Sequence, residues 1–333
     1  MNKRELIKRL SIFALVLLLI CGSWVLIKNR HTTLSRTFFT ADTPCSITLY
    51  DGNEDILNGA VELTNSIANK LNCYDENSEL FLLNKNKSSL APSDELIDTI
   101  KIGVKYSSLC PNGIFDVTVR PVTKLWDFEN GVIPKANDIQ EALKNVGYKN
   151  IEITESGIKL NGNTELDLGA VAKGYIASKI SDFLTKNGVK SAIINLGGNV
   201  TLLGDNDGND FLVGIQRPFG DDNIATVKAK ELSVVTSGTY QRSFKKDGVL
   251  YHHLLNAKTG MPQSSNLNSV TVITKNTAEA DAMSTLLFLL GKEEGLNFIN
   301  QTAGFEAVFI DQSNNITLSN GLEKDANNQI TLK

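Results

Sequence analysis

The chain has 333 residues, of which 41% are hydrophobic and 21% charged, a composition that excludes collagen-like, disordered and coiled-coil proteins. Its 33 Lys and Arg against 37 Asp and Glu give a formal net charge of −4, so no global positive field exists to attract nucleic acid, and we expect no nucleic-acid partner. The four cysteines, Cys21, Cys45, Cys73 and Cys110, show no metal-binding spacing and no disulfide framework.

An uncharged, largely apolar segment spans residues 10–27 and follows a basic segment, residues 1–9. A helix of that length reaches about 27 Å, close to the thickness of a bilayer core. Because the apolar run exceeds the roughly 7–15 residues of a cleaved signal, we predict a transmembrane anchor in preference to a signal peptide. Acylation at Cys21, as in a lipoprotein, is disfavoured because the preceding Ile20 is bulky.

These features predict a single-pass protein of the cell membrane. Residues 1–9 form a cytoplasmic basic segment, residues 10–27 the anchor, residues 28–36 a polar linker and residues 37–333 one catalytic domain. A long globular body is translocated largely regardless of the charges that flank the anchor. We therefore expect the catalytic body to lie outside the cytoplasm.

Helix and strand patterns alternate irregularly along the body. The periodicity predicts a strand over 46–50 and helices over 55–71 and 96–107. Turn residues between β-rich runs predict hairpins at 153–160, 244–255 and 309–318. No regular strand–helix alternation and no GxGxxG motif occurs, which disfavours a doubly wound fold. We predict an α+β fold with mixed, largely antiparallel sheets and packed helices.

A helix over 170–187, ended by Gly188, places Lys173 in its first turn. The helix dipole disfavours a cation at this end unless an anion lies nearby. The anion could be Asp167 in a local salt bridge or a phosphate bound at the helix N-terminus. Spacing alone leaves both alternatives open.

A second helix begins at Asn276 or Thr277 and is predicted to end at Gly291. Asp281 and Thr285 lie at positions i and i+4, so their oxygens point the same way and could hold a hard cation such as Mg²⁺. Alternatively, Thr285 bonds back to the Asp281 carbonyl while the Asp281 carboxylate is solvated.

Two neighbouring histidines, His252 and His253, fall in a predicted strand. Alternation sends them to opposite faces, so we expect one to face solvent. An inward His253 is a candidate acid or base, and a structural histidine is the alternative.

Two further segments have both a binding and a structural interpretation. The glycines of INLGGN suit close approach of a ligand to the backbone or a plain tight turn. The segment PNGIFDVTVRPVTKLW, with Phe115 and Asp116, suits either a ligand wall or the core.

Taken together and in order, several segments resemble the FAD:protein FMN transferases of the ApbE family. The matching segments are CYDENSELFLLN, GIFDVTVRPVTKLW, LDLGAVAKGYIA, AIINLGGNV, VGIQRP, VVTSGTYQRSF, YHHLLNAKTG and ADAMSTLLFLLG, and they run from about residue 40 to 291. The resemblance implies an ApbE-like, T-fold-related single catalytic domain, with two subdomains possible.

The resemblance also implies an activity. The enzyme would depend on Mg²⁺, split the pyrophosphate of its substrate FAD and transfer FMN to a threonine hydroxyl, leaving a phosphoester and AMP. The acceptor would be a flavoprotein subunit of a respiratory or electron-transfer complex. FAD pyrophosphatase activity, with water in place of threonine, and a membrane-anchored flavin-binding protein without catalysis are the alternatives. A serine hydrolase that uses Ser237 and His253 is disfavoured because no GxSxG motif surrounds the serine.

Roles carry over from the resemblance residue by residue. The metal would be held by Asp281, Thr285 and the backbone carbonyl of Ala170, with Ser284 as a neighbour. His253 and Asp281 would be catalytic, with His253 activating the threonine hydroxyl. The predicted flavin-nucleotide contacts are Tyr74, Ile114, Phe115, Asp116, Asp167, Lys173 and Leu255.

The sequence departs from the family pattern at two places. Ala41-Asp42-Thr43 stands where Met-Gly-Thr is usual, and Asn256-Ala257 stands where Asp-Pro is usual. The second departure could remove a carboxylate from the active site.

Overall fold

The computed structural model describes residues 33–333. The predicted basic segment, residues 1–9, and the predicted anchor, residues 10–27, lie outside the described residues. Within the described part, no helix has both the length and the apolar character needed to cross a membrane. The first strand begins at Leu34, so the last residues of the segment predicted as a linker, 28–36, belong to the folded body.

An eight-stranded sheet forms the centre of the described structure, and all of its strand pairs are antiparallel. In spatial order its strands are β1 (Leu34–Thr40), β2 (Thr43–Leu49), β6 (Ala192–Leu196), β7 (Asn199–Leu203), β10 (Ser233–Gly238), β13 (Leu267–Thr274), β14 (Phe305–Asp311) and β15 (Ile316–Leu318). Every residue of β13 is buried, so both faces of the sheet are covered at this strand.

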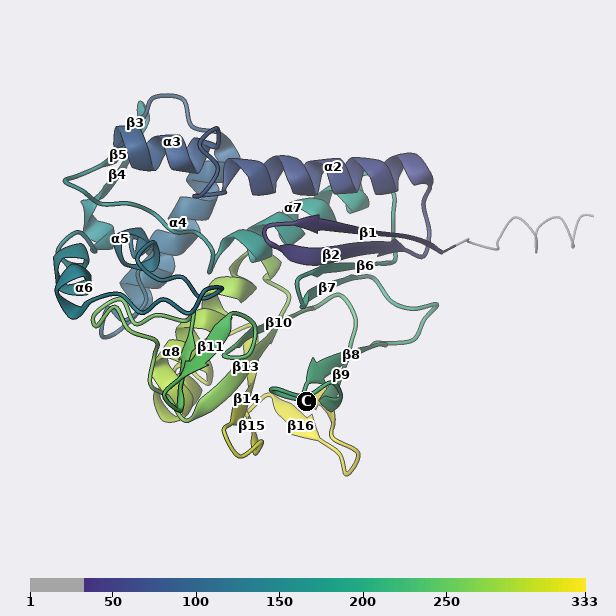
Figure 1. Cartoon of the computed structure of the whole chain (residues 1–333). Helices are drawn as coiled ribbons and strands as arrows, with labels where there is room; N and C mark the ends of the chain where they lie inside the picture. The colour runs from purple at the N-terminus through teal and green to yellow at the C-terminus, as the bar shows by residue number, and fades with distance from the viewer. Residues whose placement is uncertain (1–32) are drawn as a thin grey trace, which may run out of the picture.

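Helices cover one face and the ends of this sheet (Figure 1). They are α2 (Glu54–Lys70), α3 (Glu79–Asn86), α4 (Asp94–Leu109), α5 (Arg120–Thr123), α6 (Ala136–Leu143), α7 (Ala172–Lys186) and α8 (Thr277–Ile299), with a 3₁₀ turn at Tyr148–Asn150. Helices α2, α3 and α4 each have a side-chain N-cap. Asn53, Ser78 and Ser93 accept hydrogen bonds from backbone N–H groups of the first turn.

A four-stranded sheet packs on the opposite face of β10, β13 and β14. Its strands, in spatial order, are β16 (Leu322–Lys324), β17 (Gln329–Leu332), β9 (Asn223–Ala229) and β8 (Phe211–Gln216), and β17 pairs with β9 in parallel. The alternating buried and exposed residues of β8 show one face turned to the core. Smaller sheets are formed by β3 (Ser88–Ser89), β5 (Gly157–Leu160) and β4 (Ile151–Thr154), and by β11 (Ser243–Lys246) and β12 (Val249–His252).

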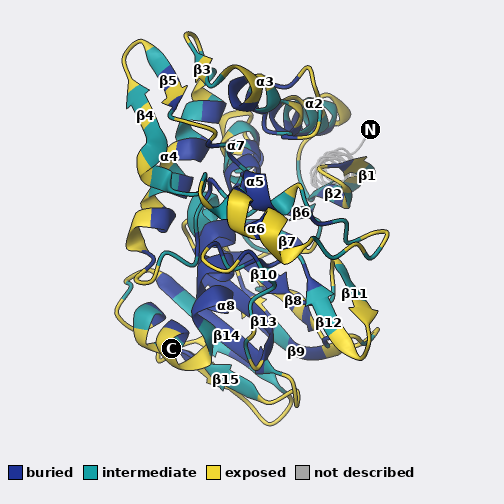
Figure 2. Ribbon diagram, turned by 60° about the vertical axis from the view of Figure 1, so that its left-hand side comes forward, coloured by how far each residue is buried: buried dark blue, intermediate teal, exposed yellow. Residues whose placement is uncertain are grey.

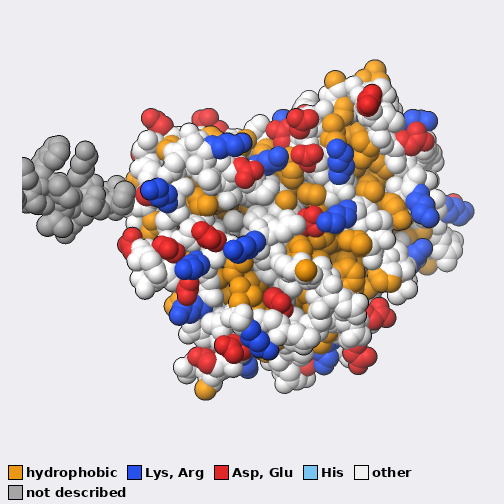
Figure 3. Space-filling view, turned by 180° about the vertical axis from the view of Figure 1, so that it is seen from behind, with side chains coloured by type: hydrophobic (Ala, Val, Ile, Leu, Met, Phe, Trp, Pro, Cys, Tyr) orange, Lys and Arg blue, Asp and Glu red, His pale blue; other side chains and the backbone are white. Residues whose placement is uncertain are grey.

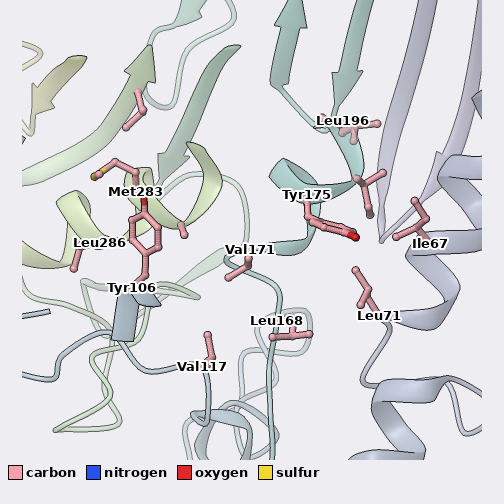
Figure 4. Close-up of a cluster of buried hydrophobic side chains, with 14 of the residues drawn as sticks. Ile67, Leu71, Tyr106, Val117, Leu168, Val171, Tyr175, Leu196, Met283 and Leu286 are labelled. Atoms are coloured by element: carbon pink, nitrogen blue, oxygen red, sulfur yellow. The ribbon is translucent and has the colours of Figure 1, made fainter. Parts of the chain in front are cut away.

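The main hydrophobic core lies where α2, α4, α7 and α8 meet the sheet (Figure 4). Tyr106 from α4 lies beside Met283 and Leu286 from α8, while Ile67 from α2 and Tyr175 from α7 fill the other side. All five side chains are at most 3% exposed. This packing fixes α7 and α8 against one another from both sides.

Helix α8 is buried almost all round in its first half, as its dark blue colour in Figure 2 indicates. Residues 280–290 are all buried, far more than the single apolar stripe that the periodicity predicts. The predicted end at Gly291 is correct as a break, because φ there is +78°. A further helical segment then continues to Ile299, which the sequence analysis missed.

The predicted α+β class with largely antiparallel sheets is confirmed. The three predicted hairpins are the pairs β4–β5, β11–β12 and β14–β15. On the face seen in Figure 3, acidic and basic side chains are interspersed, as the small net charge suggests.

Candidate functional site

The first turn of α7 lies against the side of α8. At Gly174 an added Cβ would lie 2.9 Å from the Thr277 carbonyl oxygen, 3.1 Å from the Ala278 carbonyl oxygen and 3.1 Å from the Asp281 Cβ. The two carbonyl oxygens belong to the backbone of α8 and cannot easily move away, so glycine favours this close approach. The contact brings the N-terminus of α7 to the carboxylate of Asp281.

Lys173 pairs with Asp281 across this contact, with 3.6 Å between Nζ and the nearer carboxylate oxygen, Oδ1. An anion beside Lys173 was expected from the helix dipole, but Asp281 was not among the predicted partners. Asp167 instead accepts hydrogen bonds from Thr123 Oγ1 at 2.7 Å and from the Gly169 N–H at 3.0 Å. Of the two alternatives, the local salt bridge between Lys173 and Asp167 is therefore wrong.

The carboxylate of Asp281 is 3% exposed and is held through one oxygen. Oδ1 accepts a hydrogen bond from Asn199 Nδ2 at 2.9 Å, in addition to facing Lys173. Oδ2 is buried and finds no hydrogen-bond partner within residues 33–333. Since an unpaired buried carboxylate oxygen is costly, Oδ2 fits the position of a cation ligand.

Thr285 lies one turn further along α8 and is 9% exposed. Its hydroxyl is 3.1 Å from the hydroxyl of Ser237 on β10. The hydroxyl that donates to the Asp281 carbonyl belongs to Ser284, at 2.9 Å. The alternative in which Thr285 bonds back to that carbonyl while the carboxylate is solvated is therefore wrong.

The third predicted metal ligand is the carbonyl of Ala170. The first backbone hydrogen bond of α7 joins the Tyr175 N–H to the Val171 carbonyl at 3.2 Å, so the Ala170 carbonyl stands one residue before the helical ladder. In the described part of the chain, no three His, Cys, Asp or Glu side chains gather closely enough to hold a metal ion. A cation here would thus rest on one carboxylate, with hydroxyl, carbonyl, water and phosphate oxygens, which is a set that Mg²⁺ accepts.

His252 and His253 are both largely withdrawn from solvent, contrary to the prediction that one faces it. His252 is 5% exposed and packs edge-on against Phe288, and His253 is half-buried at the end of β12. The Nδ1 atoms of both rings are buried without a hydrogen-bond partner among the described residues. The hairpin folds over α8, so each face of β12 meets protein.

The pKa values of both histidines lie below the ordinary value. Burial lowers the pKa of His252 to about 4. Burial, together with the positive charges of Lys173 and Arg242, lowers the pKa of His253 to about 3. Both imidazoles are therefore neutral at pH 7.

Tyr74 and Arg120 form a stacked pair beside Asp167. Tyr74 is 59% exposed, and the guanidinium carbon of the nine-tenths-buried Arg120 lies 4.1 Å from the centre of its ring. Burial and the negative charge of Asp167 raise the pKa of Tyr74. Arg120 was not among the predicted site residues, because an arginine before a proline at the start of a short helix has no distinctive pattern.

The other predicted flavin contacts have structural partners of their own. Phe115 and Leu255 are at most 7% exposed. The carboxylate of Asp116 accepts hydrogen bonds from the N–H and the hydroxyl of Thr118 and from the Tyr148 N–H.

Backbone hydrogen bonds join these two segments. The Ile114 carbonyl accepts a hydrogen bond from the Ala257 N–H at 2.9 Å, which holds the segment 114–116 beside Leu255. The predicted contacts Ile114, Phe115, Asp116 and Leu255 thus lie in neighbouring segments. A cavity of about 500 Å³ lies behind this segment, between Asp116, Tyr148 and Lys258, and none of the residues lining it is Lys173, His253 or Asp281.

The departure at Asn256-Ala257 leaves the loop intact. The Asn256 side chain accepts hydrogen bonds from the N–H groups of Lys258 and Thr259 and donates to Gln263. An aspartate could accept the same two backbone bonds, so this position serves its own turn. Ala257 supplies the N–H that bonds to Ile114, which a proline could not supply.

Two tight turns connect neighbouring strands of the central sheet. Ala41 and Asp42 both have positive φ in the two-residue turn between β1 and β2, and Asp42 pairs with Arg242 at 3.4 Å. Gly197 and Gly198, also with positive φ, join β6 to β7 and place Asn199 beside Asp281. The tight-turn interpretation of INLGGN is thus sufficient.

Comparison with known proteins identifies sequence relatives of this chain. A model of the ApbE family matches residues 41–309. A relative from Klebsiella pneumoniae (strain 342), named FAD:protein FMN transferase, is 37% identical over 222 residues, which cover 65% of this chain and 69% of the relative. A relative of the same name from Treponema pallidum (strain Nichols) is 32% identical over 232 residues, which cover 63% of this chain and 64% of the relative.

The chain is also similar to solved structures of ApbE proteins. The crystal structure of the ApbE protein from Thermotoga maritima MSB8 superposes with a TM-score of 0.79 at 29% identity, covering 87% of this chain and 97% of that chain. The apo form of the flavinyl transferase ApbE from Pseudomonas stutzeri gives 0.76 at 26% identity, covering 87% of this chain and 95% of that chain. The family resemblance seen in the ordered motifs is confirmed, and the chain belongs to the ApbE family.

Proposed function

We propose that this chain is a Mg²⁺-dependent FAD:protein FMN transferase. It would move FMN from FAD to a threonine hydroxyl of an acceptor flavoprotein and release AMP. One observation carries the proposal: at the N-terminus of α7, the buried Asp281 carboxylate is held through Oδ1 and keeps Oδ2 free of protein partners among the described residues. A helix N-terminus with a lysine in its first turn suits a diphosphate.

The residues around this point divide the work of binding. Asp281, Thr285 and the Ala170 carbonyl would hold the Mg²⁺. When bound, the metal would neutralise charge on the pyrophosphate and on the departing AMP. Lys173 would contact a phosphate oxygen, because its side chain is 27% exposed and its ammonium group already lies beside Asp281.

The flavin end would rest on the stacked pair of Tyr74 and Arg120. The exposed ring of Tyr74 offers a flat apolar surface for the isoalloxazine, and Arg120 beneath fixes the orientation of that ring. The backbone of residues 114–116 and of Leu255 would line the opposite side. These contacts give the binding energy that holds the FMN phosphorus in line for attack.

In the transfer step, the threonine oxygen forms a bond to the FMN phosphorus. The bond from that phosphorus to the bridging oxygen breaks, and AMP leaves with the electron pair. The neutral imidazole of His253 would accept the threonine proton. Lys173 and Arg242 contribute to the low pKa of His253, and the negative charge of a bound diphosphate would offset both and raise the basicity of the ring.

The test is transfer to a defined acceptor. The full chain is incubated with FAD, Mg²⁺ and a flavoprotein acceptor that the Klebsiella relative labels, and the relative itself serves as the positive control. We expect the acceptor band on a denaturing gel to fluoresce, because the flavin is covalently attached. One molecule of AMP should be released for each flavin attached. An unlabelled acceptor, under conditions in which the relative labels it, would contradict the proposal. Free FMN and AMP formed without acceptor, faster than transfer, would instead select the pyrophosphatase.

We further propose that residues 10–27 anchor the enzyme in the cell membrane, with the body outside the cytoplasm. The apolar character of that segment and the basic residues before it support this placement. The acceptor would then be a flavoprotein subunit of a membrane-bound electron-transfer complex. Membrane fractionation and protease treatment of spheroplasts test it: the body should be membrane-bound and digested from outside, and protection of the body would contradict the placement.

A further inference from the structure

The two side chains proposed to bind the cation are each fixed by hydrogen-bonding partners that approach from other elements. Asn199 on β7 donates to the carboxylate of Asp281, and Ser237 on β10 contacts the hydroxyl of Thr285. Asn199 and Ser237 are 2% and 7% exposed. Such partners of metal ligands orient the ligand and tune its affinity.

The hydroxyls of Thr285, Ser237 and Ser284 form a hydrogen-bonded chain that ends at the Asp281 carbonyl, and this end determines which hydroxyl donates at each step. The Asp281 carbonyl can only accept, so Ser284, 2.9 Å away, gives it its single proton. Toward Ser237, at 2.8 Å, Ser284 must then accept, so Ser237 donates its own proton there. Ser237 has no proton left for Thr285, and Thr285 therefore donates to Ser237 at 3.1 Å.

The orientation of Thr285 matters for a cation. A hydroxyl that ligates a metal must present a lone pair to it and direct its proton elsewhere. The chain through Ser237 and Ser284 takes the Thr285 proton into the protein, so the lone pairs of Thr285 are free for the cation. The hydroxyl is thereby oriented before any ion arrives.

Asn199 orients the carboxylate in the same way. The Thr236 N–H can only donate, so it faces the side-chain oxygen of Asn199, at 3.4 Å, and the amide NH₂ of Asn199 is left for Asp281. This bond, with Lys173, occupies Oδ1 and leaves Oδ2 for the cation.

We propose that Ser237 and Ser284, together with Asn199, are positioning residues that pre-orient Thr285 and Asp281 as ligands of a divalent cation. The inference deepens the proposed function and rests on it for the identity of the site. It concerns cation affinity, which is measurable without FAD or acceptor.

The test measures binding of Mn²⁺ alone to the full-length protein, by the loss of the free-ion electron paramagnetic resonance signal. Ser237→Ala should raise the Kd for Mn²⁺ by roughly tenfold, the lower end of the usual effect of removing such a partner. Ser284→Ala should have a smaller effect, because Ser237 can still accept the Thr285 proton, although Ser237 is then also free to turn its own proton toward Thr285. FAD affinity without metal should change less than twofold in both variants.

Ser233→Ala is the matched control. Ser233 lies on the same strand, is fully buried and also contacts α8, through Thr277 at 2.8 Å, but it touches neither Asp281 nor Thr285. Ser233→Ala should lower the stability to urea about as much as Ser237→Ala does, but it should keep the wild-type Kd for Mn²⁺. Equal Kd values for Ser237→Ala and Ser233→Ala, or a wild-type protein that binds no Mn²⁺, would overturn the inference. Intact Mn²⁺ binding without any flavin transfer would instead count against the proposed function alone.

Discussion

The ammonium of Lys173 lies 3.6 Å from the carboxylate of Asp281, although the two residues stand on helices far apart in the chain. The Asp281 side chain is 4% exposed and that of Lys173 is 27% exposed. The lysine therefore partly compensates a buried charge while it reaches toward the space at the N-terminus of α7. The same two groups would meet the two opposite charges of a metal–diphosphate substrate.

Replacing Lys173 should separate the two binding events. In Lys173→Gln, Mn²⁺ should bind at least as tightly as in the wild type, because a competing positive charge beside Asp281 is gone. FAD should bind about tenfold more weakly, since one charge-assisted contact to phosphate contributes about 1.5–3 kcal/mol. Mn²⁺ titration and FAD fluorescence quenching measure the two affinities.

Lys179→Gln provides the control for that experiment. Lys179 lies on the same helix and pairs with Asp98 at 3.7 Å on the surface. It should leave both affinities unchanged. A parallel loss of Mn²⁺ and FAD binding in Lys173→Gln would show that the lysine supports the fold of the site rather than the phosphate.

The close approach of α7 to α8 should make Gly174 intolerant of a side chain. Gly174→Ala would push a methyl group against two carbonyl oxygens of α8, so we expect a net loss of about 1–3 kcal/mol in the free energy of unfolding. Gly59→Ala, also within a helix, would meet only the ring of Phe183, and should change stability by less than about 1 kcal/mol. Urea unfolding measures both, and equal stabilities would contradict the assigned contact.

The low pKa of His252 predicts a loss of stability in mild acid. The unfolded chain takes up a proton near pH 6.5, whereas the folded protein does so only near pH 4. Between these values the unfolded state binds more protons, so the free energy of unfolding falls by about 1.4 kcal/mol per pH unit from this group as the pH is lowered. Above about pH 8 the group is neutral in both states and contributes no pH dependence.

His252→Leu is the variant that isolates this group. Its unfolding free energy should depend less steeply on pH between 6.5 and 4 than that of the wild type, as measured by urea unfolding at several pH values. Identical slopes for the two proteins would show that His252 is protonated in the folded state in this range.

Restoring the dipeptide usual in the family should have unequal effects at its two positions. Asn256→Asp should keep the rate of flavin transfer within twofold, because the side chain serves its own turn. Ala257→Pro should destabilise the loop by about 1 kcal/mol, since it removes the hydrogen bond to the Ile114 carbonyl. Transfer assays and urea unfolding check the pair. A large rate increase in Asn256→Asp would instead place a missing carboxylate at the reaction centre.

Local patterns predicted much of the fold. The turn residues at Gly157 and Gly248 mark their hairpins, and Gly188 ends α7 as predicted. The helical continuation after Gly291 was missed because a glycine with positive φ ordinarily ends a helix. Here packing of the following segment against the sheet, with Ile299 1% exposed, restores the helix after the break.

The partners within the candidate site could not be predicted from local sequence. Asp281 and Thr285 were predicted as a pair from their spacing on one helix. Their partners Asn199 and Ser237 approach from two strands, β7 and β10, that are distant in the chain. Such contacts depend on strand order in the sheet, which periodicity does not encode. The same reason explains why Asp281 was not among the expected partners of Lys173, which were Asp167, its near neighbour in sequence, or a bound phosphate.

The most direct measurement of the central claim compares the wild type with Asp281→Asn in flavin transfer to a defined acceptor. The substitution keeps the shape of the side chain but removes the charge that the cation requires. Mass spectrometry of the acceptor should show the mass of FMN on one threonine after reaction with the wild type and Mg²⁺. With Asp281→Asn the rate should fall by at least a hundredfold, about 2.7 kcal/mol in the activation barrier. A variant that labels the acceptor at the wild-type rate would contradict the account.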